Sequence, residues 1–150
     1  MIKLIDKDEF NKNTAIFEEI LRDIYHKNFD IDMELLKKKV VDKIKDLNSY
    51  LENDTAVLLG AYHNLSLIGF LWMYMISDNK TTKMHITQIG ILPNYQGLGY
   101  GKLLMEKAEE QALFFNVKYI ELYSKFDKKL IKFYTKNKYN IKQVKLEKKL

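Results

Sequence analysis

The segment from Ile89 to Lys102 has the residue types and spacing of an anion-binding loop. It reads Ile-Gly-Ile-Leu-Pro-Asn-Tyr-Gln-Gly-Leu-Gly-Tyr-Gly-Lys, and Asn94–Gly101 alone holds three of the chain's six glycines. The β-branched residues before it predict a strand, and the apolar spacing after it predicts a helix. A helix start offers free N–H groups and the positive end of the helix dipole, and glycines let a ligand approach closely. The segment therefore predicts a phosphate site, to which Lys102 adds positive charge.

Spacing excludes two common phosphate-binding loops. A P-loop needs Gly-Lys-Ser/Thr after four intervening residues, but Gly101-Lys102 is followed by Leu103, which cannot ligate magnesium. A dinucleotide fingerprint needs glycines at spacings of two and three at the start of an all-parallel unit. Here Gly97 and Gly99 have the first spacing, but Lys102 stands three residues after Gly99, where the third glycine is needed. Antiparallel strands are also expected to precede the loop, in place of an all-parallel unit.

The pattern Gln96-x-x-Gly99-x-Gly101, preceded by Ile-x-Ile-x-Pro-x-Tyr, resembles the coenzyme A pyrophosphate loop of the GCN5-related N-acetyltransferase (GNAT) superfamily. A second motif follows at the expected distance. It reads Phe133-Tyr-Thr-Lys-Asn-Lys-Tyr139 and resembles the short helix of that superfamily, with Lys138 where a glycine is usual. The resemblance covers Met84–Tyr139 by motif and the rest of the chain by the order of its elements.

The resemblance implies acetyl-CoA as co-substrate, with no metal. It also implies that the strand ending at Ile89-Gly90-Ile91 bulges and separates from its neighbour, so that its backbone pairs with the pantetheine arm. Asp127 stands where the family often has a contacting asparagine, although an aspartate there also suits a helix N-cap. The implied coenzyme A-binding residues are Ile89, Gly90, Ile91, Gln96, Gly97, Leu98, Gly99, Tyr100, Gly101, Lys102 and Asp127.

Two residues are candidates for acid–base chemistry. By the resemblance, Tyr134 is the general acid that protonates the departing thiolate, and an N–H near Ile91 polarises the thioester carbonyl. His85 lies six residues before Ile91, where histone-type relatives carry a glutamate base. A histidine titrates near neutrality and can accept the proton of the amine. A chain of water molecules in place of a dedicated base is the alternative.

These residues must be positioned by a mixed α/β fold on one domain, residues 1–150. We expect a mostly antiparallel sheet flanked by about four helices, in the order β-α-α-β-β-β-α-β-α-β. Hydrophobic spacing predicts one helix starting at Asp8 or Asn11 and a second over Met33–Leu51. Further strands are expected at 1–5, 55–61, 66–76, 84–92 and 119–123, a short helix at 127–136, and a final strand at Tyr139–Leu146.

Composition narrows the function classes. The chain has no cysteine, which excludes disulfides, thiolate metal sites and a cysteine nucleophile. No apolar leader or membrane-length run is present, so we expect a cytoplasmic chain with no membrane partner. Residues 1–75 carry 10 Lys and Arg against 13 Asp and Glu, a net of −3, whereas residues 76–150 carry 15 against 7, a net of +8. A basic second half suits a polyanion, whether nucleic acid, a membrane surface or a phosphorylated cofactor.

The function predicted is acetyl-CoA-dependent N-acetylation of a primary amine, on a small molecule or a peptide, by a chain that could be a homodimer. The acceptor pocket is expected between the first two helices, the Asn28–Met33 break, and strand residues near Trp72 and Tyr74. Nearby acids that could attract a cationic amine are Asp30, Asp32, Glu34, Glu52 and Asp54. Two alternatives stay open: a non-catalytic acyl-CoA-binding module on the same fold, and a basic nucleic-acid-binding protein. The second is disfavoured because Arg22 is the only arginine.

Overall fold

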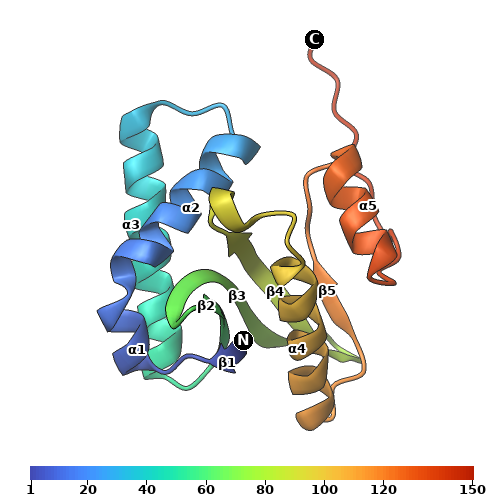
Figure 1. Cartoon of the computed structure of the whole chain (residues 1–150). Coiled ribbons are helices and arrows are strands. Elements are labelled where there is room, and N and C mark those ends of the chain that lie inside the picture. The colour runs from blue at the N-terminus through green and yellow to red at the C-terminus, as the bar shows by residue number, and fades with distance from the viewer.

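The computed structural model describes all residues from 1 to 150, arranged around one five-stranded sheet (Figure 1). The elements in chain order are β1 (Ile2–Leu4), α1 (Lys7–Lys12), α2 (Thr14–Asn28), α3 (Met33–Glu52), β2 (Ala56–His63), β3 (Ser66–Ser77), β4 (Thr82–Ile91), a 3₁₀ turn η1 (Pro93–Tyr95), α4 (Tyr100–Phe114), β5 (Ile120–Leu122) and α5 (Lys128–Lys136). The strand order is β1-β2-β3-β4-β5. Every pair is antiparallel except β4 and β5, which run parallel. The mostly antiparallel mixed fold predicted from the sequence is confirmed.

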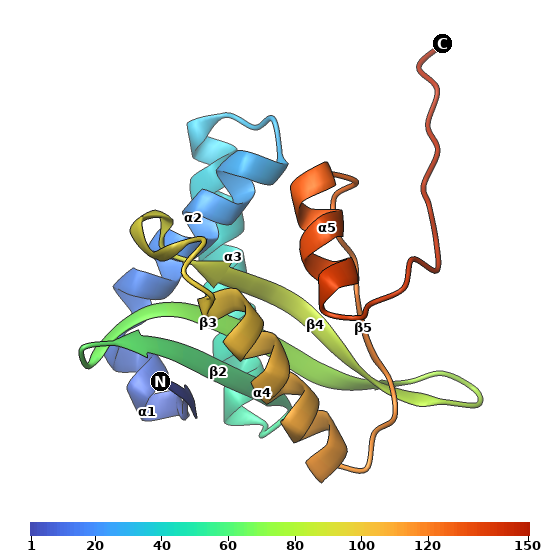
Figure 2. The same cartoon turned by 45° about the vertical axis from the view of Figure 1, so that its right-hand side comes forward.

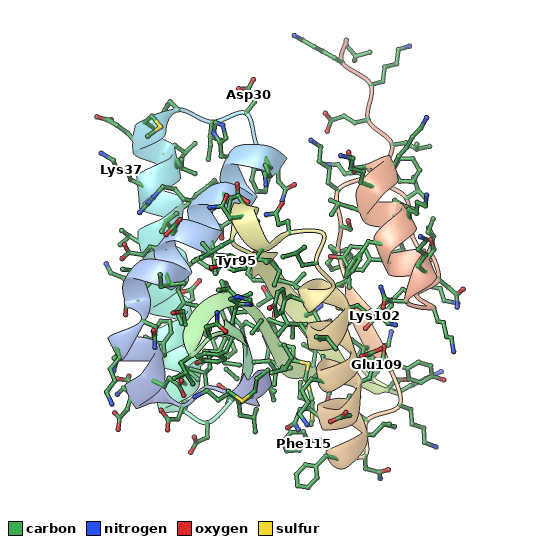
Figure 3. All side chains as sticks on the ribbon, in the orientation of Figure 1. Asp30, Lys37, Tyr95, Lys102, Glu109 and Phe115 are labelled. Atoms are coloured by element: carbon green, nitrogen blue, oxygen red, sulfur yellow. The ribbon has the colours of Figure 1, made fainter.

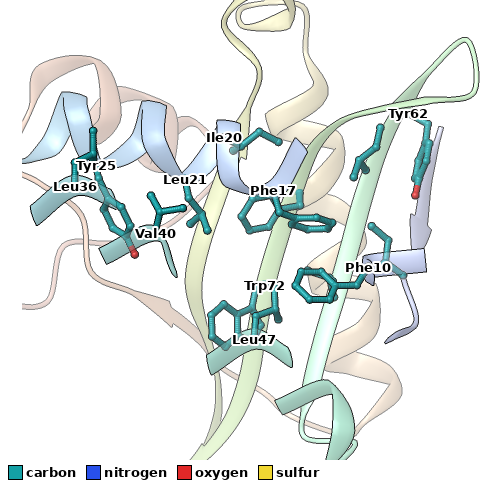
Figure 4. Close-up of a cluster of buried hydrophobic side chains, with 14 residues drawn as sticks. Phe10, Phe17, Ile20, Leu21, Tyr25, Leu36, Val40, Leu47, Tyr62 and Trp72 are labelled. Carbon is teal, nitrogen blue, oxygen red and sulfur yellow. The ribbon is translucent and has the colours of Figure 1, made fainter. Parts of the chain in front are cut away.

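Helices cover both faces of the sheet, and each face has its own hydrophobic core. Helices α1 to α3 cover one face, where a cluster of 14 buried residues includes Phe10, Phe17, Phe70 and Trp72 (Figure 4). Helix α4 crosses the other face (Figure 2), where 13 buried residues form a second cluster around Leu71 and the inner side of α4. The sheet is therefore buried on both sides over β2 and β3, and its β5 end is less covered.

Local sequence signals explain the helix boundaries. Asp6, Asp32 and Asp127 each precede a helix and accept hydrogen bonds from backbone N–H groups of its first turn. Such side chains satisfy donors that have no partner within the helix. The helix expected from Asp8 or Asn11 onward is broken into α1 and α2. Asn13 and Thr14 bond through their side chains to backbone carbonyls of the preceding turn, which offers the chain an alternative to a continuous helix.

The prediction of a final strand at Tyr139–Leu146 is wrong. Residues after α5 form no regular element and extend away from the body of the protein (Figures 1 and 2). Apolar and polar residues alternate over 139–142 and again over 144–147, but the phase changes at Gln143, so no single face is apolar throughout. A strand also needs a hydrogen-bonding neighbour, and this segment has none.

No helix of the structure has the length and apolar character needed to cross a membrane.

Candidate active site

The site begins where β4 and β5 separate. Their ladder contains only three pairs, and its last pair joins Ile86 to Leu122. Beyond it β4 continues to Ile91 with β3 on one side and no strand on the other (Figure 2). A cavity of about 120 Å³ occupies this opening, lined by residues 86–89 of β4, residues 122–125, Asn28, Leu130 and Tyr134.

Backbone polar groups of β4 face this opening. The N–H of Leu92 donates to the carbonyl of Ile68, toward β3. Because N–H groups alternate between the two sides of an antiparallel strand, those of Ile89 and Ile91 are directed away from β3. No strand meets them there, so they are available to an extended ligand. The predicted separation of this strand from its neighbour is thus present, with Ile89 and Ile91 at its open edge.

The bulge lies at a different residue from the one expected. Trp72 pairs with Gln88 and Met73 pairs with Ile86, so Thr87 is the extra residue, whereas Gly90 pairs regularly with Phe70. Gly90 is needed for a different reason. A Cβ atom there would lie 2.4 Å from Cγ2 of Ile20 on α2, which leaves no room for a side chain. The glycine lets α2 pack directly onto the end of β4.

The glycine loop ends in a set of free backbone donors. None of the six N–H groups from Gly97 to Lys102 donates to another group of the protein, and the first helical bond of α4 runs from Leu103 to Gly99. Gly97 and Gly99 have φ of 77° and 92°, the left-handed region that favours glycine. A Cβ on either would meet no protein atom within 4 Å, so the space over the loop is open. Loop shape and donors fit a diphosphate at a helix N-terminus.

Several side chains of the glycine loop contact other residues of the protein. The Tyr100 hydroxyl lies 2.7 Å from Nδ1 of His63 on β2, and Leu98 is exposed. Gly101 has no left-handed φ, and a Cβ atom there would lie 3.3 Å from the ring of Phe133 on α5. Lys102 lies at the start of α4 (Figure 3), and its Nζ is 3.6 Å from a carboxylate oxygen of Glu106. Backbone N–H groups of these residues, more than their side chains, are available to a ligand.

Gln96 fastens the loop to two other elements. Its amide nitrogen donates to the carbonyl of Ile91 at 2.8 Å and lies 3.2 Å from a carboxylate oxygen of Asp23 on α2. Its amide oxygen accepts from the Lys27 ammonium at 3.3 Å. These contacts hold the loop against the end of β4 and against α2, so Gln96 is a positioning residue in this structure.

Tyr134 lies on α5 and lines the opening between β4 and β5. Its ring packs among Phe133 and Tyr139 on the α4 side of the sheet. Burial raises the pKa of the Tyr134 hydroxyl to about 12, because the phenolate would lose its hydration. The residue is therefore protonated, and able to donate, throughout the neutral and mildly alkaline range.

His85 lies on β4 outside that cavity, on the face of the sheet covered by α3. Its ring stacks near Tyr74 and Tyr123, with centroids 5.4 and 5.7 Å away. Its Nδ1 lies 3.9 Å from a carboxylate oxygen of Glu121 on β5. This places a titratable ring beside an acid, with Tyr123 between His85 and the cavity that Tyr134 also lines.

Asp127 caps α5 in the way its type predicts. Its carboxylate accepts from the N–H groups of Lys129 and Leu130 at 2.9 and 3.2 Å. The carboxylate thereby fixes the start of the helix that carries Tyr134, and this capping role is present whether or not Asp127 also contacts a ligand.

The expected acceptor pocket needs several corrections. Helix α3 has 20 residues and is about 30 Å long, so Asp32 and Glu34 at its start cannot share a site with Glu52, its last residue, or with Asp54 beyond it. Glu52 pairs with Lys7 at 2.6 Å, and Asp32 is the α3 N-cap. Trp72 is buried in the core instead of lining a pocket. Asp30 lies at the tip of the α2–α3 connection, away from the sheet (Figure 3).

Sequence reasoning missed Glu121 and Tyr123. Glu121 and Tyr123 alternate with Ile120 and Leu122, which pack into the α4-side core, so a period-two reading of this short strand assigns them to the opposite face. Asn28, the start of the polar break expected in the acceptor pocket, ends α2 and lines the cavity from a distant part of the chain. The structure contains no group of three or more His, Cys, Asp or Glu side chains that could hold a metal ion.

Comparison with known proteins agrees with this geometry. Residues 15–139 match the model of the acetyltransferase (GNAT) family. The fold is similar to that of a proposed acetyl transferase from Pyrococcus furiosus, with 22% identity, full coverage of both chains and a TM-score of 0.78. It is also similar to the PaiA N-acetyltransferase of Thermoplasma acidophilum in complex with coenzyme A, with 19% identity, coverage of 91% and 87%, and a TM-score of 0.75.

A third similar structure is an aminoglycoside acetyltransferase from an uncultured soil metagenomic sample, in complex with sisomicin. Its identity is 15%, it covers 100% of this chain and 95% of its own, and the TM-score is 0.74. At these identities the three structures support the fold alone. A comparison with curated proteins gave no match.

Proposed function

This chain belongs to the GNAT family of acetyltransferases, and we propose that it transfers an acetyl group from acetyl-CoA to a primary amine by direct attack of the amine on the thioester. One observation carries the proposal. Ile89, at the open edge of β4, and Tyr134 line the same cavity, and β4 leads from there into the loop whose six N–H groups over Gly97–Lys102 are free. The proposal treats residues 1–150 as one catalytic domain.

The loop and the strand edge divide the binding of the co-substrate. Acetyl-CoA, when bound, supplies the acetyl group as an activated thioester. The N–H groups of Gly97–Lys102 suit its diphosphate, because they are free, adjacent and at the positive end of α4. The N–H groups of Ile89 and Ile91 suit the amide groups of an extended arm and the carbonyl oxygen of the thioester. Gln96 sets the distance between these two sets of donors.

Tyr134 is proposed to donate its proton to the departing sulfur. With a pKa of about 12 the phenol is a weaker acid than in water, but burial also penalises a thiolate and raises the pKa of its conjugate thiol. A neutral hydrogen-bond donor close to the sulfur then stabilises the developing negative charge more than the same donor would in solvent. This balance predicts a moderate contribution of Tyr134 to the rate.

His85 is proposed to take the proton released by the amine, directly or through water. A carboxylate oxygen of Glu121, on the neighbouring strand, lies 3.9 Å from Nδ1 of His85. The aromatic rings of Tyr74 and Tyr123 flank His85. These rings and the Glu121 carboxylate are groups that attract a cationic amine. The acceptor is accordingly proposed as a small molecule or peptide with a positively charged primary amine. The cytoplasmic location of the protein stays a prediction.

The test measures release of free thiol from acetyl-CoA by the purified protein, with panels of polyamines, amino acids, aminoglycosides and peptide N-termini. Turnover with one class, together with a mass increase of one acetyl group on that acceptor, supports the proposal. Saturable binding of acetyl-CoA with no thiol release for any class would instead favour the non-catalytic acyl-CoA-binding alternative. No binding of acetyl-CoA would reject both.

A further inference from the structure

The glycine loop between β4 and α4 is little constrained along its middle. Gly97 and Gly99 both have a left-handed φ, Leu98 between them is exposed, and the space over the two glycines is open. None of the N–H groups over Gly97–Lys102 has a partner in the protein. Glycine loses more backbone entropy than any other residue when it is ordered. The contacts of the residues at the two ends of the loop therefore determine how far it is ordered before a ligand binds.

His63, the last residue of β2, contacts residues on both sides of these glycines. Its Nδ1 lies 2.7 Å from the hydroxyl oxygen of Tyr100, the first residue of α4. Its ring also lies beside that of Tyr95 (Figure 3), the last residue of η1, with a centroid separation of 5.3 Å. Residues 96–99 separate the two tyrosines along the chain. One side chain of a strand that does not line the cavity therefore bridges the two ends of the loop.

The β2–β3 hairpin holds His63 in this place. The two turn residues, Asn64 and Leu65, have φ of 47° and 69°, and two consecutive positive φ angles are typical of the tight turn that matches the twist of a hairpin. Beside the turn, the carbonyl of Ile68 on β3 accepts a hydrogen bond from the N–H of Leu92, which follows β4. The hairpin is thus joined to the residue from which the loop begins, and His63 has a fixed support.

The contacts of His63 differ from those of Gln96. Gln96 fastens the start of the loop to α2 and to Ile91. His63 fastens Tyr100, at the other end of the loop, to β2. The N–H of Tyr100 is itself one of the six free donors, so a shift of this residue displaces a donor and changes the direction of the two that follow it. The arrangement of the donors therefore depends on both ends of the loop.

We propose that His63 is a positioning residue for acetyl-CoA: it holds the α4 end of the glycine loop in the shape that binds the diphosphate. The inference rests on the proposed function. A loop that is ordered before binding loses little freedom when the ligand binds, so the affinity is higher. His63 does not line the cavity that contains Tyr134. Loss of its contacts is therefore expected to raise KM for acetyl-CoA and to leave kcat at saturation unchanged.

A double-mutant cycle measured by calorimetry with coenzyme A tests the proposal. His63→Phe keeps a ring beside Tyr95 and removes the nitrogen that contacts Tyr100, and Tyr100→Phe removes only the hydroxyl. Each change is expected to raise the dissociation constant about three- to fivefold. The double variant is expected to bind no more weakly than the weaker single variant, because both changes remove the same hydrogen bond. Ser66→Ala, at the exposed residue that pairs with His63 in the hairpin, is the control and is expected to bind like wild type.

Two further measurements separate positioning from hairpin stability. His63→Asn puts an amide close to the position of Nδ1 and is expected to bind coenzyme A more tightly than His63→Phe. The thiol-release assay is expected to show the rise in KM for acetyl-CoA without a fall in kcat. Unchanged dissociation constants in both single variants, whatever their melting temperatures, or fully additive losses in the double variant, overturn the proposal and leave the proposed function standing. No binding of coenzyme A by the wild-type protein would reject the proposed function and this inference with it.

Discussion

The side-chain amide nitrogen of Gln96 lies 2.8 Å from the carbonyl oxygen of Ile91. This bond joins the start of the glycine loop to the end of β4, and contacts of the same amide with Asp23 and Lys27 join both to α2. The free N–H groups of the loop and those of the strand edge are thereby held at a fixed separation. A ligand that uses both sets of donors depends on this bond without touching the glutamine.

Replacing Gln96 tests whether this separation matters. Gln96→Ala leaves the carbonyl of Ile91 without its partner and frees the loop, so we expect the dissociation constant of coenzyme A to rise by about three- to tenfold. Gln96→Glu is expected to be worse, because it cannot donate to the carbonyl and places a second carboxylate beside Asp23. Isothermal titration calorimetry measures both. Gln143→Ala, outside any regular element, is the control, and equal affinities across all four proteins would contradict the positioning role.

The loop itself is tested at Gly99. Its φ of 92° is strained for any β-branched residue, and Gly99→Val also brings bulk to the free N–H groups. We expect coenzyme A affinity to fall by tenfold or more, which corresponds to roughly 1.4 kcal/mol. Gly101→Ala is expected to be milder, because the tip of the Phe133 ring is the nearest atom and can move.

A valine in a left-handed position also destabilises the fold, so the comparison needs a matched control. Asn116→Val places the same residue type at φ of 57° just after the C-terminal end of α4, at the opposite end of that helix from the loop. It is expected to lower the melting temperature in a similar way and leave coenzyme A affinity unchanged. Loss of affinity in both variants would show that the effect comes from folding and not from the loop.

The fold was largely predictable because each signal is local. Helical spacing, capping aspartates at Asp32 and Asp127, and short polar turns define most elements within a few residues. The two errors in the order of elements have non-local causes. The break between α1 and α2 depends on side-chain bonds of Asn13 and Thr14 to the backbone. The missing last strand depends on a partner edge, which the residues of the segment cannot reveal.

The site was predictable to the extent that it is made of backbone. The glycine loop was indicated by its own residue types and spacing, and Tyr134 by the resemblance of its motif to the family. The resemblance implies a bulge at Ile89-Gly90-Ile91, whereas Gly90 is required by the contact of α2 with β4 and the bulge lies at Thr87. Pairings such as Gln96 with Asp23, or His85 with Glu121, join segments that only the fold brings together.

Stability at acidic pH is expected to depend on Glu9. Its carboxylate binds the Lys3 ammonium at 2.7 Å and accepts from the Tyr62 hydroxyl. The hydrogen bond with Lys3, and then that with Tyr62, lowers the pKa of Glu9 below its ordinary value. A lowered folded-state pKa means that the stabilisation is complete above the unfolded-state pKa and is lost as pH falls through the folded-state value.

The corresponding measurement is the free energy of unfolding in urea between about pH 7 and pH 3. Glu9→Gln is expected to cost about 1 kcal/mol near neutrality and to flatten the loss of stability on acidification. Glu19→Gln changes an exposed carboxylate with no ion pair or hydrogen bond in the structure and is expected to change neither. Identical pH profiles for wild type and Glu9→Gln would remove the ion pair from the acid response.

The most direct test of the catalytic account is the turnover number of Tyr134→Phe at saturating acetyl-CoA, with the acceptor identified by the thiol-release panel. The change keeps the buried ring and removes only the hydroxyl. If that hydroxyl protonates the departing sulfur, kcat is expected to fall by roughly 10²-fold, while coenzyme A affinity and the melting temperature stay close to wild type. The weakened acidity implied by its pKa of about 12 places the effect at the lower end of the range for general acids. An unchanged kcat in Tyr134→Phe would contradict the assignment of Tyr134 as the acid and, with it, the proposed use of this site.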